Sequence, residues 1–301
     1  MTVLSNFPAV PNRIAIACEY LQAVGEAGVS RESFERQLSP GPSDVDGEDR
    51  SGTSMAREVL REIEAIGLID SSEEGVRLAP DLNAKPMDYP QWLAWLIPWM
   101  CDRIVDPLRA EQCRQLGVPS ALAWLLCQDA RRPVRYSGAH AELLNQQVGG
   151  VDGLGFNLGN DATFQNLVYW ARYLGFAETF EFPSSSTAFV IADPSRAIRR
   201  VLPQVFSETP DLAIVPFTER LAAALPVLEE GSARRTVEQR LAPPFQRAEQ
   251  HFSSATSLAL QRLEHDGTIQ LPTDSDAEQW IIQDGQGARS VSRVVFLKGK
   301  S

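Results

Sequence analysis

Residues 163–180 read TFQNLVYWARYLGFAETF, and two other stretches share their pattern, TSMAREVLREIEAIGLID at 53–70 and ATSLALQRLEHDGTIQL at 255–271. The three stretches align on Gly67, Gly175 and Gly267. Apolar or small side chains stand four and seven residues before each glycine, a spacing that defines one face of a helix. Each helix has a polar start that suits an N-cap, at 52–54, 160–161 and 253–254, and the glycine suits a left-handed helix end. The pattern predicts helices at 53–66, 163–174 and 255–266.

Strand-forming runs follow each of these predicted helices. Glu74 and Gly75 are expected to form a turn before Val76 and Leu78, and two β-rich runs flank residues 183–186, which are expected to form the second turn. In the third stretch, residues 269–271 and 280–282 flank a polar turn. Runs separated in this way are typical of hairpins. A last run, residues 291–297, fits no repeat and is expected to add an edge strand or to serve as a docking tail.

Two shorter helices are predicted before each long one, at 12–24 and 30–38, 119–128 and 139–148, and 217–228 and 234–241. Three helices followed by a two-stranded wing resemble the winged-helix class of helix-turn-helix domains. The resemblance covers about 12–80, 119–192 and 216–283, here called the first, second and third copies. The connections before the long helices, at 39–52, 149–160 and 242–253, exceed the usual short turn of this class.

The resemblance implies a mainly α fold with small β-hairpins (α+β) and three tandem winged-helix domains joined by helical linkers. The boundaries follow from the repeat: winged-helix domain 1 at 1–82, a helical linker at 83–118, domain 2 at 119–205, and domain 3 with the C-terminal strand at 206–301. The linker carries Trp92, Trp95 and Trp99 on one helical stripe. This stripe is expected to pack domains together or to form a partner-binding groove.

The composition bounds the function. Of 301 residues, 44% are hydrophobic and 22% charged, which excludes a mainly disordered chain. The formal net charge is −11, so any contact with nucleic acid has to be local. The four cysteines contain no Cys-x-x-Cys, which excludes a disulfide scaffold and a zinc signature. The longest apolar stretch, 92–100, is shorter than the roughly 20 residues of a bilayer span, and a cytoplasmic location is expected.

Motifs for catalysis are not found in the sequence. The glycine-rich stretch GGVDGLGFNLGN at 149–160 lacks the spacing of a phosphate-binding loop and is expected to be a connection. His140, His251 and His265 have no cysteine or carboxylate at metal-ligand spacing. We therefore expect no catalytic residue, no metal and no cofactor. An enzyme with an unrecognised carboxylate site stays an alternative.

Local charge separates the three copies. Residues 1–85 hold 8 basic and 15 acidic side chains, a net of −7. On the long helix of the first copy, Arg57 and Arg61 have Glu58, Glu62 and Glu64 as neighbours. The preceding loop is acidic at Asp44, Asp46, Glu48 and Asp49. The first copy would repel phosphate and is interpreted as a protein-binding or architectural module.

The second copy is the candidate for nucleic-acid binding. Residues 162–177 contain no acidic side chain. The helical period turns Phe164, Leu167, Val168, Ala171 and Leu174 inward and Gln165, Asn166, Tyr169 and Tyr173 outward, with Arg172 at the border. Asparagine and glutamine can hydrogen-bond adenine, and arginines on either side of the helix can contact phosphates. The alternative is that Tyr169, Trp170 and Tyr173 bury against another domain or a partner. The candidate residues are Arg131, Arg132, Arg135, Gln165, Asn166, Tyr169, Arg172, Tyr173, Arg196, Arg199 and Arg200.

The third copy has mixed charge. Arg234, Arg235, Arg240 and Arg247 surround its second helix, but Glu264 and Asp266 end its long helix.

These features favour a non-enzymatic winged-helix subunit of a bacterial multi-protein complex acting on DNA, in anti-phage defence or DNA modification. In size and layout the chain resembles the DpdG family, accessory proteins of 7-deazapurine DNA modification clusters. Its expected partners are other protein subunits and, through the second copy, double-stranded DNA, with no membrane. The plan is also similar to the kite subunits of condensin-like complexes. A sequence-specific transcription regulator is a further alternative, although three wings and a charge of −11 fit it poorly.

Overall fold

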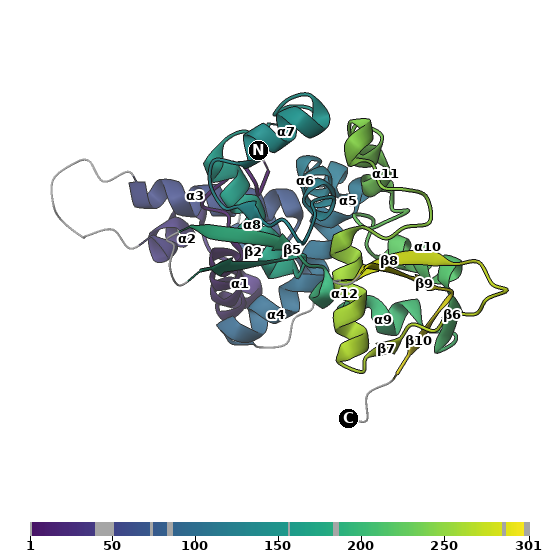
Figure 1. The fold of residues 1–301 in the computed structure, drawn as a ribbon. Helices are drawn as coiled ribbons and strands as arrows, with labels where there is room; N and C mark the ends of the chain where they lie inside the picture. Colours follow the sequence, from purple (N-terminus) through teal and green to yellow (C-terminus); the bar gives the residue numbers. More distant parts are fainter. Residues whose placement is uncertain are drawn as a thin grey trace. The chain divides into compact units, whose positions relative to one another are not determined.

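The computed structural model describes residues 2–39, 51–72, 75–82, 87–155, 157–182, 187–284 and 287–297 (Figure 1). The chain forms two compact units. Unit 1 comprises Met1–Ile104 and Leu108–Leu116, and unit 2 comprises Val105–Pro107 and Gly117–Ser301. The division falls inside the predicted linker at 83–118, and the predicted domain boundaries stay a prediction.

Unit 1 contains the first copy and most of the linker. Its elements, in chain order, are α1 (Pro11–Val24), the 3₁₀ turn Gly25–Ala27, α2 (Arg31–Leu38), α3 (Ser51–Ile66), β1 (Ile69–Ser72), β2 (Gly75–Leu78), the 3₁₀ turn Pro80–Leu82, α4 (Tyr89–Met100), a π-helical turn (Cys101–Val105) that reaches the unit boundary, and α5 (Pro107–Gln112), which crosses it.

Backbone contacts tie the first copy together. Ser30 caps α2 by accepting a hydrogen bond from the Ser33 amide (3.1 Å). Val29, just before α2, exchanges two backbone hydrogen bonds with Val76 of β2 (2.9 and 2.8 Å). Gly75 permits this approach, because a Cβ there would lie 2.8 Å from the Val29 carbonyl oxygen. The acidic residues Asp44, Asp46, Glu48 and Asp49 and the turn residue Glu74 lie outside the described residues.

The three tryptophans of the linker helix α4 differ in burial. Trp92, Leu96 and Met100 are buried, and the Trp92 indole N–H donates to Gln22 of α1 (3.3 Å). Trp95 and Trp99 are only half-buried. The three tryptophans therefore differ in burial, because the buried positions follow the spacing i, i+4, i+8 and take only Trp92 into the core. Their role in packing domains together or in binding a partner stays a prediction.

Unit 2 begins with the second copy. Its elements are α6 (Gly117–Leu126), β3 (Val134–Arg135), α7 (His140–Val148), α8 (Asp161–Leu174), β4 (Ala177–Glu181), β5 (Ala188–Ala192) and α9 (Ser195–Val205). The strands form one antiparallel sheet in the order β3-β5-β4.

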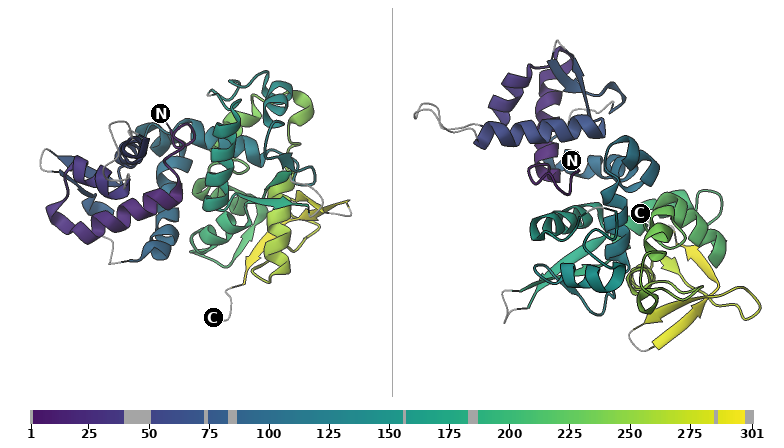
Figure 2. Two further views of the ribbon diagram at one scale, coloured as in Figure 1. Left: turned by 90° about the vertical axis from the view of Figure 1, so that its left-hand side faces the viewer. Right: turned by 90° about the horizontal axis from the view of Figure 1, so that it is seen from above.

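The third copy completes unit 2. Its elements are β6 (Asp211–Ala213), α10 (Ile214–Ala224), α11 (Ser232–Glu238), the 3₁₀ turn Pro243–Phe245, α12 (Ser254–His265), β7 (Ile269–Gln270), β8 (Trp280–Asp284), β9 (Gly287–Val291) and β10 (Arg293–Phe296). Helix α10 lies about a turn earlier than predicted, since Pro226 disfavours helical backbone at Leu225. Figure 2 shows α12 beside the strands of this copy.

The hairpin predicted for the third copy is wrong. Strand β7 pairs with β10 instead of β8, and β8 pairs with β9. Pro272 follows β7 closely and cannot donate a ladder hydrogen bond, while its carbonyl accepts one from the Ser292 amide (3.1 Å). The last strand run is also not an edge, because β10 lies in the middle of a sheet ordered β6-β10-β7. Long-range pairing of this kind has no local sequence signal.

The three predicted long helices are confirmed. They occupy α3, α8 and α12, and the three glycines that follow have φ of +77°, +86° and +68°. The aligned side chains before the glycines are buried: Leu60, Ile63, Val168, Ala171, Leu260 and Leu263. The fold is mainly α with small antiparallel β elements, as predicted. The assignment of three winged-helix domains stays a prediction. Within the part of the chain that is described, no helix is long and apolar enough to span a membrane.

Candidate nucleic-acid interface

Helix α8 is the frame of the predicted interface. Asn160 caps it by accepting from the Ala162 amide (2.8 Å), and its inward side chains are buried as predicted: Phe164, Leu167, Val168, Ala171 and Leu174. Gln165, Tyr169 and Tyr173 are half-exposed and Arg172 is exposed. The prediction that Asn166 points outward is wrong. Asn166 is 6% exposed, because α8 packs against both α6 and β4 and buries a wider arc than one stripe.

The arginines after the β4–β5 hairpin are engaged within unit 2. Arg196 forms an ion pair with Glu178 (3.0 Å) and donates to the Arg172 carbonyl. Arg199 pairs with Asp266 at the end of α12, and Arg200 donates to the Leu174 carbonyl (3.0 Å). These contacts hold α9 against α8 and α12. They reduce the charge that Arg196 and Arg199 can offer to phosphate.

The arginines before α7 differ in their pairing. Arg131 is held by Asp129, with 3.0 Å between Nε and Oδ1. Arg132 and Arg135 are exposed and form no ion pair with any described residue. Arg172 on α8 is likewise exposed and forms no ion pair with any described residue. The second copy therefore presents Arg132, Arg135 and Arg172 as uncompensated positive charges.

The first copy contrasts with the second. Arg61 pairs with Glu58 on its own helix, as the i, i+3 spacing predicts. Arg57 pairs with Glu35 (2.9 Å) and Arg31 with Glu64 (2.8 Å), so α2 and α3 neutralise each other. The charges of the arginines on α3 are thus compensated. The partner of Arg57, Glu35, lies on a different helix and reaches it through tertiary packing.

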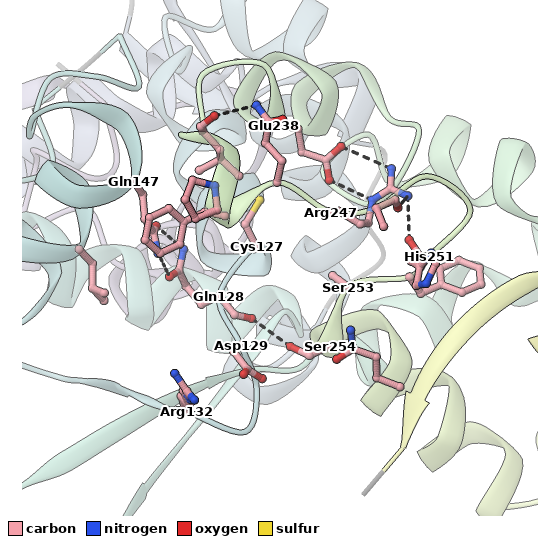
Figure 3. Close-up of a pocket in the computed structure, with 18 of the residues that line it drawn as sticks. Cys127, Gln128, Asp129, Arg132, Gln147, Glu238, Arg247, His251, Ser253 and Ser254 are labelled. Atoms are coloured by element: carbon pink, nitrogen blue, oxygen red, sulfur yellow. Dashed lines mark hydrogen bonds and ion pairs between the residues drawn. The ribbon is translucent and has the colours of Figure 1, made fainter. Parts of the chain in front are cut away.

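Arg132 also lies on the wall of a cleft within unit 2. The cleft has a volume of about 580 Å³ and runs between the α6–β3 loop and α7 on one side and α11 and the start of α12 on the other. Figure 3 shows Arg132 and Asp129 on the first wall and Glu238, Arg247 and His251 on the second. The cleft combines side chains from the second and third copies.

A largely buried ionic network joins Arg234, Glu238 and Arg247, which line the cleft, to Glu229 and Glu230. Arg234 is 1% exposed; its Nε donates to Glu238 (2.8 Å) and its Nη2 lies 3.7 Å from Glu229. Arg247 donates to Glu238 (3.1 Å) and Glu230 (3.0 Å). The charges of Arg234 and Arg247 in the third copy are therefore compensated by carboxylates within the protein. The network was not predicted from the sequence, although the i, i+4 spacing of Arg234 and Glu238 is a signal for such a pair.

The network also fixes the start of α12. Glu229 accepts hydrogen bonds from the Ser253 amide (2.9 Å) and the Thr256 hydroxyl (2.7 Å). Burial raises the pKa of Glu229, but the charge of Arg234 and these hydrogen bonds outweigh it and hold that pKa below its usual range. Burial also raises the pKa of the neighbouring Cys127 thiol to about 11. Cys127 is therefore protonated near neutral pH and is not an activated nucleophile.

Among the residues that the structure describes, no group of three or more His, Cys, Asp or Glu side chains is placed to hold a metal ion.

A family model described as DpdG-like matches residues 1–277. The chain belongs to the DpdG-like family. The comparisons with curated proteins and with solved structures give no match. Membership confirms the resemblance to the DpdG family that size and layout indicated, and it fits an accessory protein of a DNA-modification or defence cluster.

The DpdG-like match includes the candidate interface. It spans elements of both units, from the N-terminus to a point three residues before β8. Helix α8, the arginines before α7 and the buried network all lie inside it. The β8–β9 hairpin and β10 follow the matched residues.

His140 at the start of α7 predicts an acid sensitivity of unit 2. Its buried ring stacks on Phe164 (4.4 Å between centroids), and burial lowers its pKa. A group whose pKa is depressed by folding adds stability above its ordinary pKa of about 6.5, and this stability is lost as the pH falls. We expect acidification from about pH 7 to 5 to lower the urea midpoint more in the wild type than in His140→Gln. If the urea midpoints of the two proteins depend equally on pH, His140 is not the source of the acid sensitivity.

Proposed function

We propose that the protein is a non-catalytic winged-helix subunit of a DNA-modification or defence complex, and that its second copy contacts double-stranded DNA. One observation carries the proposal. Arg132, Arg135 and Arg172 are exposed and have no ion-pair partner among the described residues, whereas the arginines of α3 are compensated. In a chain of net charge −11, such a local excess of positive charge is the kind of surface that duplex phosphates select.

The element order of the second copy supports the winged-helix part of the proposal. Helices α6, α7 and α8 precede the β4–β5 hairpin, and β3, between α6 and α7, joins the same sheet. In winged-helix proteins the third helix enters the major groove and the wing meets the backbone. By this analogy α8 would present Gln165, Tyr169 and Tyr173 to DNA, with Arg132 and Arg135 on the phosphates.

Unit 1 is proposed as the protein-docking part. The charges of α2 and α3 compensate each other, so these helices offer phosphate little attraction. Trp95 and Trp99 keep half-buried rings on α4, and Arg103 lies 5.4 Å from the Trp99 ring centre. Aromatic and arginine side chains of this kind are enriched at protein interfaces. Partner subunits of the same complex are the expected ligands.

The test is duplex binding measured by fluorescence anisotropy over a salt series starting at about 50 mM. We expect Arg132→Ala/Arg135→Ala to weaken binding by a similar factor on duplexes of different sequence. The slope of log K against log salt should flatten by about 0.9 unit for each phosphate that the variant no longer neutralises. The matched control is Arg57→Ala/Arg61→Ala, whose charges are already paired.

Two results would overturn the duplex contact. One is loss of binding in the Arg57/Arg61 variant while the Arg132/Arg135 variant binds normally. The other is absence of duplex binding by the wild type at the lowest salt. Turnover of DNA or nucleotide by the pure protein, lost on changing one acidic residue, would instead establish the enzyme alternative.

A further inference from the structure

The sheet of the second copy carries an aromatic row on its outer face. In the β3-β5-β4 sheet, Arg135 pairs with Phe189, and Phe189 pairs with Phe180. Residues that are directly opposite share a face, so these three side chains form one row across the three strands. The neighbouring row, Val134, Val190 and Thr179, lies on the other face, where Val134 and Val190 are buried. The aromatic row therefore faces away from the core.

The rings form a compact cluster. Phe180 and Phe189 stack with 5.5 Å between centroids and 21° between planes. Phe182, just beyond β4, stands nearly perpendicular to both, at 5.2 and 5.6 Å. Phe182 is 51% exposed and the other two rings are half-buried. Figure 2 shows this hairpin projecting from the helices of unit 2. Three clustered phenylalanines on an exposed sheet face leave unusual apolar area in water.

The charges on this outer face favour an anionic partner. Arg135 has no ion-pair partner among the described residues. Arg132, which lies just before β3, has none among them either. The acidic residue on the same face, Glu178, is paired with Arg196 (3.0 Å). Glu181 pairs with Ala188 and so lies on the opposite face. An aromatic surface with uncompensated arginine suits a ligand that has both flat apolar rings and negative charge.

We propose that this outer face, formed by Phe180, Phe182, Phe189 and Arg135, stacks unpaired bases of single-stranded DNA while Arg135 contacts the backbone. Bases are flat apolar rings joined to phosphates, and stacking on aromatic side chains tolerates any sequence. The inference goes beyond the proposed duplex contact and rests on the proposed function only in that the second copy binds DNA. It places single-stranded DNA on the sheet and leaves α8 for the duplex.

The experiment compares an oligothymidine of about 20 nucleotides with a duplex, each labelled and titrated with the full chain. Phe182→Ala is expected to weaken oligothymidine binding at least about fivefold and to change duplex binding much less. Phe182→Trp should retain or strengthen oligothymidine binding, because it keeps an aromatic face. The control is Phe7→Ala, which removes a phenylalanine of similar exposure (46%) from unit 1.

The outcomes separate this inference from the proposed duplex contact. Unchanged oligothymidine affinity in Phe182→Ala, or no oligothymidine binding by the wild type, overturns base stacking. Equal losses on oligothymidine and duplex also overturn it, because the change would then act through the fold or the backbone. If the duplex does not bind but oligothymidine binding depends on Phe182, the duplex contact fails and stacking stands. If the duplex binds fully and oligothymidine does not bind, stacking fails and the duplex contact stands.

Discussion

Replacing Arg234 by methionine is expected to lower the free energy of unfolding of unit 2 by about 3–5 kcal/mol. Arg234 and Glu229 are both almost fully buried, and Arg234 bridges Glu229 and Glu238. Without the guanidinium, Glu229 would be a buried carboxyl group with only neutral hydrogen-bond donors, and burial would favour its protonation. Removing one partner of such a pair leaves an uncompensated charge in a region of low dielectric constant. Hydrogen exchange read by mass spectrometry reports the loss for each unit separately.

The neighbouring Arg235 provides the matched control. It is exposed on the same helix, and Arg235→Met is expected to change the unfolding free energy by less than about 0.5 kcal/mol. Adding Glu229→Gln to Arg234→Met should recover part of the loss, because the unpaired charge is then gone. A loss in Arg234→Met no larger than that in Arg235→Met would show that the network does not support unit 2.

Replacing Trp92 by alanine is expected to destabilise unit 1 by about 3–5 kcal/mol. Trp92 is fully buried on α4, its N–H donates to Gln22 of α1, and its ring meets Trp95 edge-on at 5.2 Å. Truncation would open a large cavity between α1 and α4 and leave the Gln22 side chain without this donor. Faster hydrogen exchange across α1 and α4 is the expected measurement.

Trp99→Ala is the comparison for Trp92. Trp99 is half-buried, and its contacts are the ring of Trp95 (5.5 Å) and the guanidinium of Arg103. We expect less than half of the stability loss of Trp92→Ala. Loss of a partner subunit in Trp99→Ala at intact stability would support docking through α4. Equal destabilisation by the two changes would contradict the division of the stripe into a core residue and surface residues.

Local pattern was sufficient for the three long helices. Apolar side chains at helical spacing, a polar N-cap and a glycine that adopts positive φ are interactions within one stretch of chain. Leu60, Val168 and Leu260 are accordingly buried where the alignment places them. The hairpins after α3 and α8 were predictable for the same reason, since their strands are adjacent in the sequence.

Pairing between distant segments could not be predicted in this way. Strand β7 pairs with β10, and the whole β8–β9 hairpin lies between these two strands in the sequence. The sequence alone offered 280–282 as the nearer strand for β7. The strand that pairs with Ile269 is decided by packing between segments that are distant in the sequence.

The candidate interface shows the same division. The sequence by itself determined a mainly α chain with three long helices that each end at a glycine, a net charge of −11 and a second copy whose long helix is free of acidic residues after its first turn. Tertiary structure decided which arginines stay available. Glu35 reaches Arg57 from another helix, Asp266 reaches Arg199 across 67 residues, and Arg234 is drawn into the core, while Arg132 and Arg135 remain unpaired among the described residues. The physical reason is that a charge is compensated by whatever lies within a few ångströms, and spacing along the chain fixes those neighbours only within one helix or one hairpin.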